Sequence, residues 1–196
     1  MVKILQTALI AVLVVLSSTT SAYISPKQIL RKGTKLVYDV NYSGTQYECT
    51  VTMNEESDAY NFDWKISSPE NTSGSINIAK TALENANSLF SNFTGGTIQL
   101  KDECCFLISK KMFNALKGNG SIEIYTDKKE GVMTIFGNPY NHTQTFGYQN
   151  NFSNEFECRT VTDGGDFQIT YVNDENFPLI VEMNLGMKMK LKSIYN

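Results

Sequence analysis

The sequence predicts a mostly β domain of the α+β class, with about ten antiparallel strands in a strongly curved sheet or half-barrel and one or two helices inserted mid-chain. Three observations predict it. Apolar and polar residues alternate over most of the chain, as they do in strands with one buried face. Turn-rich links of hairpin length separate these stretches. Apolar residues at helical spacing occur only near the middle of the chain. A sandwich of two sheets is the alternative architecture.

The first 22 residues have the three parts of a secretory signal peptide. Lys3 supplies a positive start, residues 8–16 form an apolar run, and Thr20-Ser21-Ala22 is a small-residue ending. The alternative is an N-terminal membrane anchor, but the nine-residue run is far shorter than the roughly 20 residues that span a bilayer. We therefore expect cleavage after Ala22 and a secreted or periplasmic protein.

Residues 23–196 are predicted to form a single antiparallel β domain. Removing the signal peptide from the 196 residues leaves 174, enough for one domain to bury its own core. The full chain has 17 basic and 20 acidic residues, and it lacks the basic patch of a nucleic-acid-binding protein. No later stretch is long and apolar enough to span a membrane. We expect neither a nucleic-acid partner nor a transmembrane segment.

Three strands open the domain with a period of two residues. Residues 36–42 and 47–53 alternate on either side of Ser43-Gly44-Thr45, which predicts a hairpin. Residues 60–66 then alternate in the same way and place Tyr, Phe, Trp and Ile on one face. All three strands are expected to face one core.

The period changes between residues 78 and 93, where apolar residues recur at helical spacing before Gly95-Gly96 closes the segment. This predicts one helix. A second, shorter helix is predicted from Ser109, a favourable N-cap, to Leu116, with a glycine-rich stop after it. Short strands are predicted between the helices, at residues 97–100 and 105–108.

Strands return in the second half of the chain. Seven are predicted, over residues 121–126, 132–136, 143–148, 155–162, 166–173, 179–184 and 187–194. The last places Met and Leu on one face and three lysines on the other. One interpretation is a surface for anionic lipid whose apolar face lines an adaptable cavity. The favoured one is an edge strand whose lysines block further pairing while Met and Leu fill the core.

Four cysteines follow the predicted signal peptide: Cys49, Cys104, Cys105 and Cys158. An even number in an exported protein favours two disulfides. Adjacent residues on a strand point to opposite faces, so we expect Cys104 and Cys105 to bridge to Cys49 and Cys158, in an order that the sequence leaves open. The alternative is a reactive vicinal pair or a set of metal thiolates, which usually shows two-residue spacers and nearby histidines.

No motif specifies a reaction, a cofactor or a metal. His142, the only histidine, lies in a loop-like stretch and is predicted to be a surface residue. The candidates for a hydrolytic carboxylate pair are Glu155 with Glu157, and Glu55-Glu56 beside Asp58. Both sets have the pattern of solvated surface. We therefore expect no catalytic, cofactor-binding or metal-binding residue, with a carboxylate-pair hydrolase as the remaining enzymatic hypothesis.

Six Asn-x-Ser/Thr triplets occur in the chain, a modest excess for this composition. In a eukaryotic host the loop-like sites Asn71, Asn119 and Asn141 are the candidates for N-glycosylation.

Three stretches, 33–40 (GTKLVYDV), 108–116 (ISKKMFNAL) and 177–183 (FPLIVEM), together resemble exported bacterial proteins of unknown function. Those proteins are similar in outline to the half-barrel of periplasmic lipoprotein carriers, in which a curved antiparallel sheet closes over helices around an apolar cavity. The resemblance spans most of the predicted domain. It transfers no functional residue, and a shared fold does not imply a shared function.

The sequence supports three functional hypotheses, in this order. The first is an exported non-catalytic binding protein that holds an apolar or amphipathic small molecule or lipid in a curved-sheet cavity. The aromatic and Met side chains of the inward strand faces indicate it. The second is an extracellular or cell-surface module whose Asn-, Ser- and Tyr-rich loops bind a protein or a glycan. The third is the carboxylate-pair hydrolase.

Overall fold

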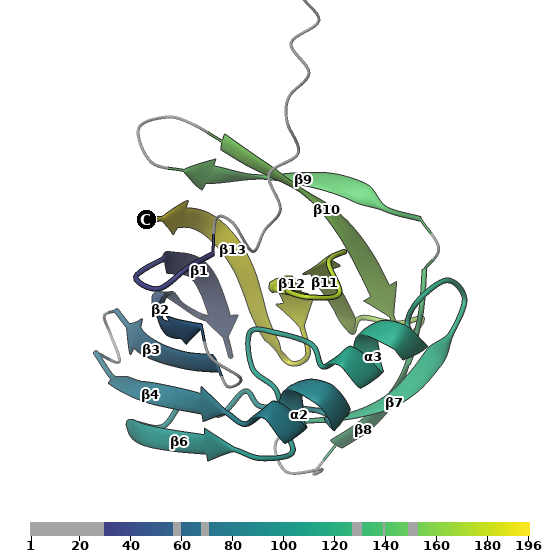
Figure 1. Ribbon diagram of the computed structural model, residues 1–196, viewed down its shortest axis with the longest axis horizontal. Coiled ribbons are helices and arrows are strands. Elements are labelled where there is room, and N and C mark those ends of the chain that lie inside the picture. Colours follow the sequence, from purple (N-terminus) through teal and green to yellow (C-terminus); the bar gives the residue numbers. More distant parts are fainter. Residues whose placement is uncertain (1–29, 57–59, 68–70, 127–130, 139, 149–152) are drawn as a thin grey trace, which may run out of the picture.

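The computed structural model describes residues 30–56, 60–67, 71–126, 131–138, 140–148 and 153–196. The predicted signal peptide lies outside the described residues. The predicted fold class is confirmed, because the described chain is mostly β with two short helices, α2 (Lys80–Asn85) and α3 (Lys110–Ala115). Figure 1 shows that the strands form one curved sheet and that both helices lie near its open side.

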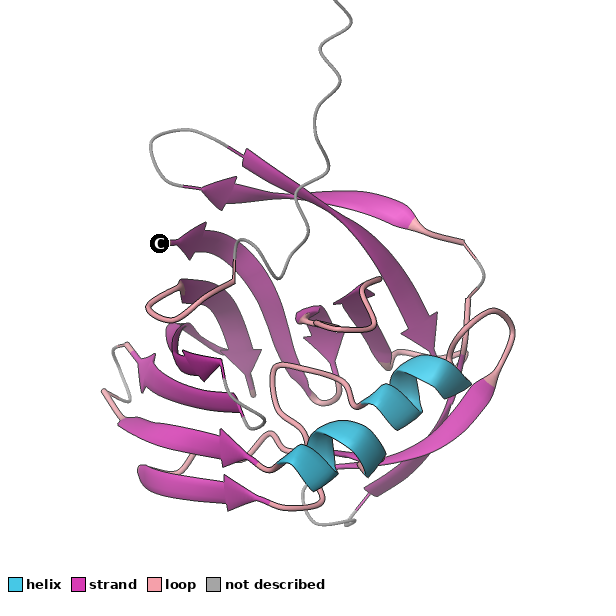
Figure 2. Ribbon diagram, viewed as in Figure 1, coloured by secondary structure: helices cyan, strands magenta, loops and turns pink. Residues whose placement is uncertain are grey.

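The sheet contains 13 strands in the described part of the chain. They are β1 (Lys35–Tyr42), β2 (Thr45–Glu56), β3 (Tyr60–Ile66), β4 (Ser73–Ile78), β5 (Ser88–Leu89), β6 (Gly96–Leu100), β7 (Ser121–Thr126), β8 (Gly131–Phe136), β9 (His142–Tyr148), β10 (Ser153–Thr162), β11 (Gln168–Val172), β12 (Ile180–Asn184) and β13 (Met187–Tyr195). Figure 2 distinguishes these strands from the connecting loops.

Five of the strands close into a barrel. β10, β11, β12 and β13 are consecutive neighbours, and β9 pairs with both β10 and β13. Two arms extend from this ring, one running from β13 through β1, β2, β3 and β4 to β6, the other from β10 through β8 and β7 to β5. The sheet is therefore part closed barrel and part open curved wall.

Three strand pairings are parallel: β4 with β6, β5 with β7, and β9 with β13. The sequence predicted antiparallel pairing throughout. Parallel neighbours need a crossover connection, and the chain supplies one in each case. The segment containing α2 connects β4 to β6, the longer segment containing α3 connects β5 to β7, and strands β10 to β12 lie between β9 and β13.

The predicted helix over residues 78–93 is wrong in length. It ends at Asn85, and Ala86 is already extended, with φ −61° and ψ 145°. Asn85, Asn87 and Ser88 are poor helix formers, and the chain instead enters β5, which pairs with β7. The periodicity did identify buried positions, since Ala82 and Ala86 lie in the core.

Two strand predictions also need correction. β4 was not predicted, because its six residues contain only two large apolar side chains, Ile76 and Ile78. Residues 105–108 were predicted as a strand but make a single isolated bridge, between Leu107 and Leu179. This stretch is buried on all sides and lies in no ladder.

The second predicted helix is confirmed as α3, and Ser109 is its N-cap. The Ser109 hydroxyl oxygen accepts a hydrogen bond from the Met112 backbone N–H at 3.0 Å. The same hydroxyl donates to the Ala86 carbonyl oxygen at 2.5 Å. This one side chain therefore caps α3 and ties it to the end of α2.

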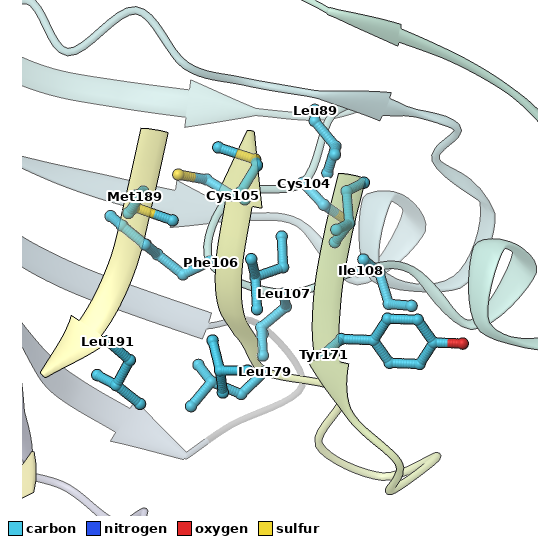
Figure 3. Packing of buried hydrophobic residues seen from close by; sticks show 14 of the residues in the cluster. Leu89, Cys104, Cys105, Phe106, Leu107, Ile108, Tyr171, Leu179, Met189 and Leu191 are labelled. Atoms are coloured by element: carbon cyan, nitrogen blue, oxygen red, sulfur yellow. The ribbon is translucent and has the colours of Figure 1, made fainter. Parts of the chain in front are cut away.

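The interior of the curved sheet is filled by the chain itself. The central segment, residues 103–109, is buried along its whole length, and its apolar members meet side chains from β11 and β13 (Figure 3). The Phe106 ring lies 5.8 Å from the Tyr38 ring and 5.6 Å from the Phe62 ring, between centroids. The Phe106 carbonyl oxygen also accepts from the Ile180 N–H at 2.7 Å. Any space for a ligand must therefore lie beside this segment.

The lysine-bearing strand, β13, lies inside the sheet. It pairs with β1, β12 and β9. The prediction that it is an edge strand is therefore wrong. Met187, Met189 and Leu191 do fill the core. Lys192, on the outer face, lies 3.4 Å from an Asp39 carboxylate oxygen and 3.5 Å from one of Glu48.

Candidate functional site

A cleft of about 1310 Å³ opens at one end of the curved sheet. Most of its walls come from four places: the β1–β2 turn, the β12–β13 turn, the loop over residues 90–95, and β6. The lining residues are Tyr42, Ser43, Thr45, Tyr47, Ile66, Thr72, Phe90, Ser91, Asn92, Phe93, Thr94, Gly95, Thr97, Ile98, Gln99, Leu100, Glu103, Leu185, Gly186 and Met187.

Local sequence explains why two hairpin turns reach this end. β1 ends at Tyr42 and β2 begins at Thr45, so Ser43-Gly44 is a two-residue loop. Both residues have positive φ, 50° for Ser43 and 84° for Gly44, as a type I′ turn requires. At the β12–β13 turn Gly186 has φ 87°. These turns place the two hairpins side by side as one wall of the cleft.

The floor of the cleft is apolar. Ile66, Leu100 and Met187 line it and belong to the buried core. Phe93 is half-buried, and its ring meets the Phe106 ring of the central segment at 5.6 Å between centroids. A ligand in the cleft would therefore rest against side chains that are continuous with the protein core.

The rim of the cleft is polar and largely uncharged. Exposed hydroxyl and amide groups of Ser43, Asn92 and Gln99 line it together with Tyr42, which is 57% exposed. No lysine or arginine occurs among the described lining residues. The arrangement can hold a molecule that has an apolar part and a hydrogen-bonding part.

Glu103 is the only Asp, Glu, Lys, Arg or His among the described lining residues. It is 7% exposed and accepts a hydrogen bond from the Ser88 hydroxyl at 3.0 Å. Its position at the start of the central segment fixes a carboxylate at the inner end of the cleft. The described lining thus offers an anionic ligand group a carboxyl group and no lysine or arginine.

The four cysteines occupy the core as thiols, so the predicted pair of disulfides is not formed. Cys49 lies on β2 and Cys158 on β10, while Cys104 and Cys105 belong to the central segment. The Cys104 thiol donates to the Ala82 carbonyl oxygen at 3.4 Å. The expected pairing assumed that Cys104 and Cys105 lie on a strand and point to its opposite faces. They lie instead in the central segment, which is buried along its whole length.

Burial makes three of these thiols poor nucleophiles. Desolvation raises the pKa of Cys49 and of Cys104 to about 12. Desolvation also raises the pKa of Cys158 to about 12, with a smaller contribution from the Glu157 charge. A thiol with such a pKa is protonated at neutral pH, which disfavours the reactive-pair and metal-thiolate interpretations.

The other predicted candidates do not converge on a site. His142 is exposed, with its Nε2 3.3 Å from Gln144 Nε2. Glu155 and Glu157 are exposed, and Glu157 Oε1 accepts from Asn173 Nδ2 at 2.8 Å. The side chains of Glu55-Glu56 and Asp58 lie outside the described residues. The described part of the chain contains no group of three or more His, Cys, Asp or Glu placed to hold a metal ion.

The three glycosylation candidates are exposed. Asn71 has φ 46°, and Asn119 follows α3. The Asn141 side-chain nitrogen, the atom to which a glycan would be attached, donates a hydrogen bond to Glu157 Oε1.

A second concavity, about 610 Å³, lies on the outer face of β1, β2, β12 and β13. Two of its lysines face carboxylates: Lys190 lies 3.5 Å from Glu182, and Lys192 bridges two acids. Hydrogen bonding to Asp39 is the main cause that raises the pKa of Lys192. Three lysines and three acids line this surface, so it has no excess of either sign.

None of the described helices is long and apolar enough to cross a membrane. Comparisons of the chain with protein-family models, curated proteins and solved structures gave no match. The resemblance to exported half-barrel proteins therefore stays a prediction. The cleft residues have to be interpreted from their own geometry and chemistry.

The sequence analysis identified some residues of this site, but it did not predict that they lie together. Tyr42 and Tyr47 belong to the predicted hairpin, and Met187 to the predicted last strand. The loop over residues 90–95 was placed at the end of a helix, so Phe93 was not recognised as a wall residue. Glu103 gave no signal, because a single acid before two cysteines matches no motif.

Proposed function

We propose that the protein is an exported, non-catalytic binding protein that holds an amphipathic ligand in the cleft at the end of its curved sheet. The observation that carries the proposal is the composition of the cleft wall, with an apolar floor continuous with the core and an uncharged polar rim. Because the central segment fills the interior, the ligand-binding space of the predicted half-barrel is limited to this opening.

The charge of the cleft restricts the ligand class. Glu103 is the only acid among the described lining residues, and none of them is a lysine or an arginine. An anionic ligand group would therefore meet a carboxyl group in the cleft and no cationic side chain of the lining to attract it. The preferred ligands are therefore neutral or cationic amphiphiles, and fatty acids and other anionic amphiphiles are disfavoured.

Titration calorimetry with three lauryl compounds, each below its micelle concentration, tests this. We expect one molecule of lauryl maltoside (neutral) or laurylamine (cationic) to bind per chain, and laurate (anionic) to bind at least about tenfold more weakly. In the Glu103→Gln variant, laurate should gain affinity while lauryl maltoside keeps its own. Glu123→Gln, on an exposed face of β7, is the matched control and should change neither.

Two results would overturn the proposal: no binding by any of the three compounds, or tighter binding of laurate than of lauryl maltoside. Unchanged selectivity in Glu103→Gln would show that the ligand binds elsewhere.

The second candidate function is a glycan-binding module. The exposed Tyr42 ring and the amides of Asn92 and Gln99 on one rim favour it, since aromatic faces and amides commonly bind sugars. Maltose without the lauryl chain separates the two candidates. Equal affinity for maltose and lauryl maltoside would favour the glycan module, and binding of lauryl maltoside alone would favour the amphiphile.

Export is supported by the pattern of the first 22 residues. Mass measurement of the protein recovered from its own host tests this part separately. A chain beginning at Tyr23 is expected, and an intact N-terminus in the cell interior would contradict export.

A further inference from the structure

Two buried hydrogen-bond donors without acceptors lie next to each other at the junction of β10, β11 and α3. Nε of Arg159 and the hydroxyl of Tyr171 are both buried, and neither has a hydrogen-bond partner among the described residues. Arg159 and Tyr171 are direct partners in the β10–β11 ladder, which places their side chains on the same face of the sheet. A buried donor in a native protein usually has a hydrogen-bond acceptor, which here would be an ordered water or an ion.

The surroundings fix the position of both groups. The Phe113 ring of α3 packs against the Tyr171 ring at 5.8 Å between centroids, edge to face. Figure 3 shows the Tyr171 hydroxyl at the far end of the ring, directed away from the other labelled side chains. One Arg159 terminal nitrogen reaches the Asn138 carbonyl oxygen at 3.5 Å. Tyr171 itself is fully buried.

The guanidinium charge is not neutralised by any described carboxylate, since the ion pairs of the described chain do not include Arg159. The nearest carboxylate along β10 is Glu157, two residues earlier and on the same face. Its Oε1 already accepts hydrogen bonds from Asn173 and Asn141. What the site lacks is an acceptor, and a positive charge favours an acceptor that is negative.

We propose that Arg159 and Tyr171 form a binding site for a small anion, a halide or a carboxylate group, which accepts hydrogen bonds from Arg159 Nε–H and the Tyr171 hydroxyl. The site is separate from the cleft, because neither residue lines it. A bound anion would join β10 and β11 beneath α3 and so stabilise the native state.

The electrostatics of Tyr171 agree with this arrangement. Burial raises the pKa of Tyr171 to about 12, while the Arg159 charge acts to lower it. The phenol therefore keeps its proton at neutral pH and is available as a donor. The guanidinium group is always charged.

Thermal unfolding of the full chain tests the proposal, with sodium methanesulfonate, which has neither a halide nor a carboxylate group, as the background salt at constant ionic strength. Replacing methanesulfonate by chloride, or in a second series by acetate, should raise the unfolding temperature of the parent chain in a saturable way. A rise with chloride only identifies a halide site, and a rise with acetate identifies a carboxylate site. No saturable rise with either would mean that water satisfies the two donors, and would overturn the proposal.

Variants assign the effect to the two residues. Arg159→Gln should abolish the anion-dependent rise, and Tyr171→Phe should weaken the apparent affinity about tenfold. Arg31→Gln, which changes the only other arginine of the chain, is the matched control and should retain the full rise. An undiminished rise in Arg159→Gln would contradict the assignment.

Chloride-35 NMR on the parent chain keeps the test independent of folding in the variants. Binding at Arg159 should broaden the chloride signal. If acetate binds the same site, an excess of acetate should displace the chloride and restore the narrow line. If the signal stays narrow and acetate has no thermal effect, the site does not bind small anions.

Discussion

The Trp64 ring packs edge to face against the Phe93 ring, with centroids 5.5 Å apart and planes at 69°. Phe93 lines the cleft, and Trp64 is the only tryptophan of the chain. The indole is 1% exposed, so its fluorescence reports on the packing of this wall. Occupation of the cleft can therefore be followed without a label.

Phe93→Leu should alter the Trp64 emission while leaving the protein folded. The change removes the aromatic edge contact but keeps an apolar wall of similar volume, so the free energy of unfolding should fall by less than about 1.5 kcal/mol. Emission spectra and urea unfolding measure the two effects. Unchanged emission would contradict the contact, and a larger loss of stability would mean that Phe93 is a core residue rather than a wall of the cleft.

Gly74→Ala should destabilise the protein by about 1–3 kcal/mol. A Cβ at Gly74 would lie 2.2 Å from the Gly96 carbonyl oxygen and 2.9 Å from a Trp64 ring carbon, so the β4–β6 pair would have to separate. Gly95→Ala is the matched control, because its Cβ would meet nothing closer than 3.5 Å. Urea unfolding should separate the two variants, and equal stability would show that β4 and β6 are not this close.

The strand-rich part of the fold was predictable because its residues alternate. Leu36, Tyr38 and Val40 are buried where the period of two places them, and so are Met187, Met189 and Leu191. The alternation fails at Val37, which is buried as well, and at Tyr42, which is exposed. β4 escaped prediction because Ser73, Gly74 and Ser75 give too little apolar contrast. The ring closure through β9 and β13 depends on long-range pairing, on which local periodicity contains no information.

Stability should fall steeply above pH 9. The pKa of Cys49, Cys104 and Cys158 is about 12 in the folded chain, against an ordinary value of 9.0. Above pH 9 the unfolded chain therefore loses these protons while the folded chain keeps them, and deprotonation favours unfolding. Each such thiol contributes a slope of up to about 1.4 kcal/mol per pH unit.

Urea unfolding between pH 7 and pH 11 measures this slope, and Cys104→Ala should make it shallower by up to one thiol's contribution. The same thiols should resist a thiol reagent in the native protein and react after denaturation. An identical slope in the variant, or fast labelling of the native chain, would contradict their burial.

Ser109→Ala should cost about 1–3 kcal/mol. The substitution removes the N-cap of α3 and leaves the buried Ala86 carbonyl oxygen without its donor. Thr81→Ala is the control: it removes an exposed hydroxyl that donates to the Lys101 carbonyl oxygen at 3.2 Å, and should cost less than about 0.5 kcal/mol. Thermal unfolding distinguishes them, and similar losses would mean that Ser109 is not a shared link between α2 and α3.

Only part of the candidate cleft could be predicted from the sequence. Tyr42 and Tyr47 were placed on the correct hairpin, and inward aromatic residues predicted an apolar ligand-binding surface. The interior cavity of the expected half-barrel is instead filled by the central segment, whose path depends on a positive φ of 62° at Phe106 and on bridges to distant residues. The cysteine pairing failed for the same reason, since two-face alternation does not apply to a segment that is buried all round.

A fluorescence titration of Trp64 with lauryl maltoside tests the central claim most directly. The parent chain should show a saturable change in emission with one ligand per chain. Leu185→Glu, which replaces an apolar side chain of the cleft wall with a charged one that the lauryl chain would have to desolvate, should abolish it. Val132→Glu, at an apolar position that is 60% exposed and does not line the cleft, should leave it intact. No saturable change in the parent chain, or the same change in Leu185→Glu, would contradict a ligand-binding cleft at this end of the sheet.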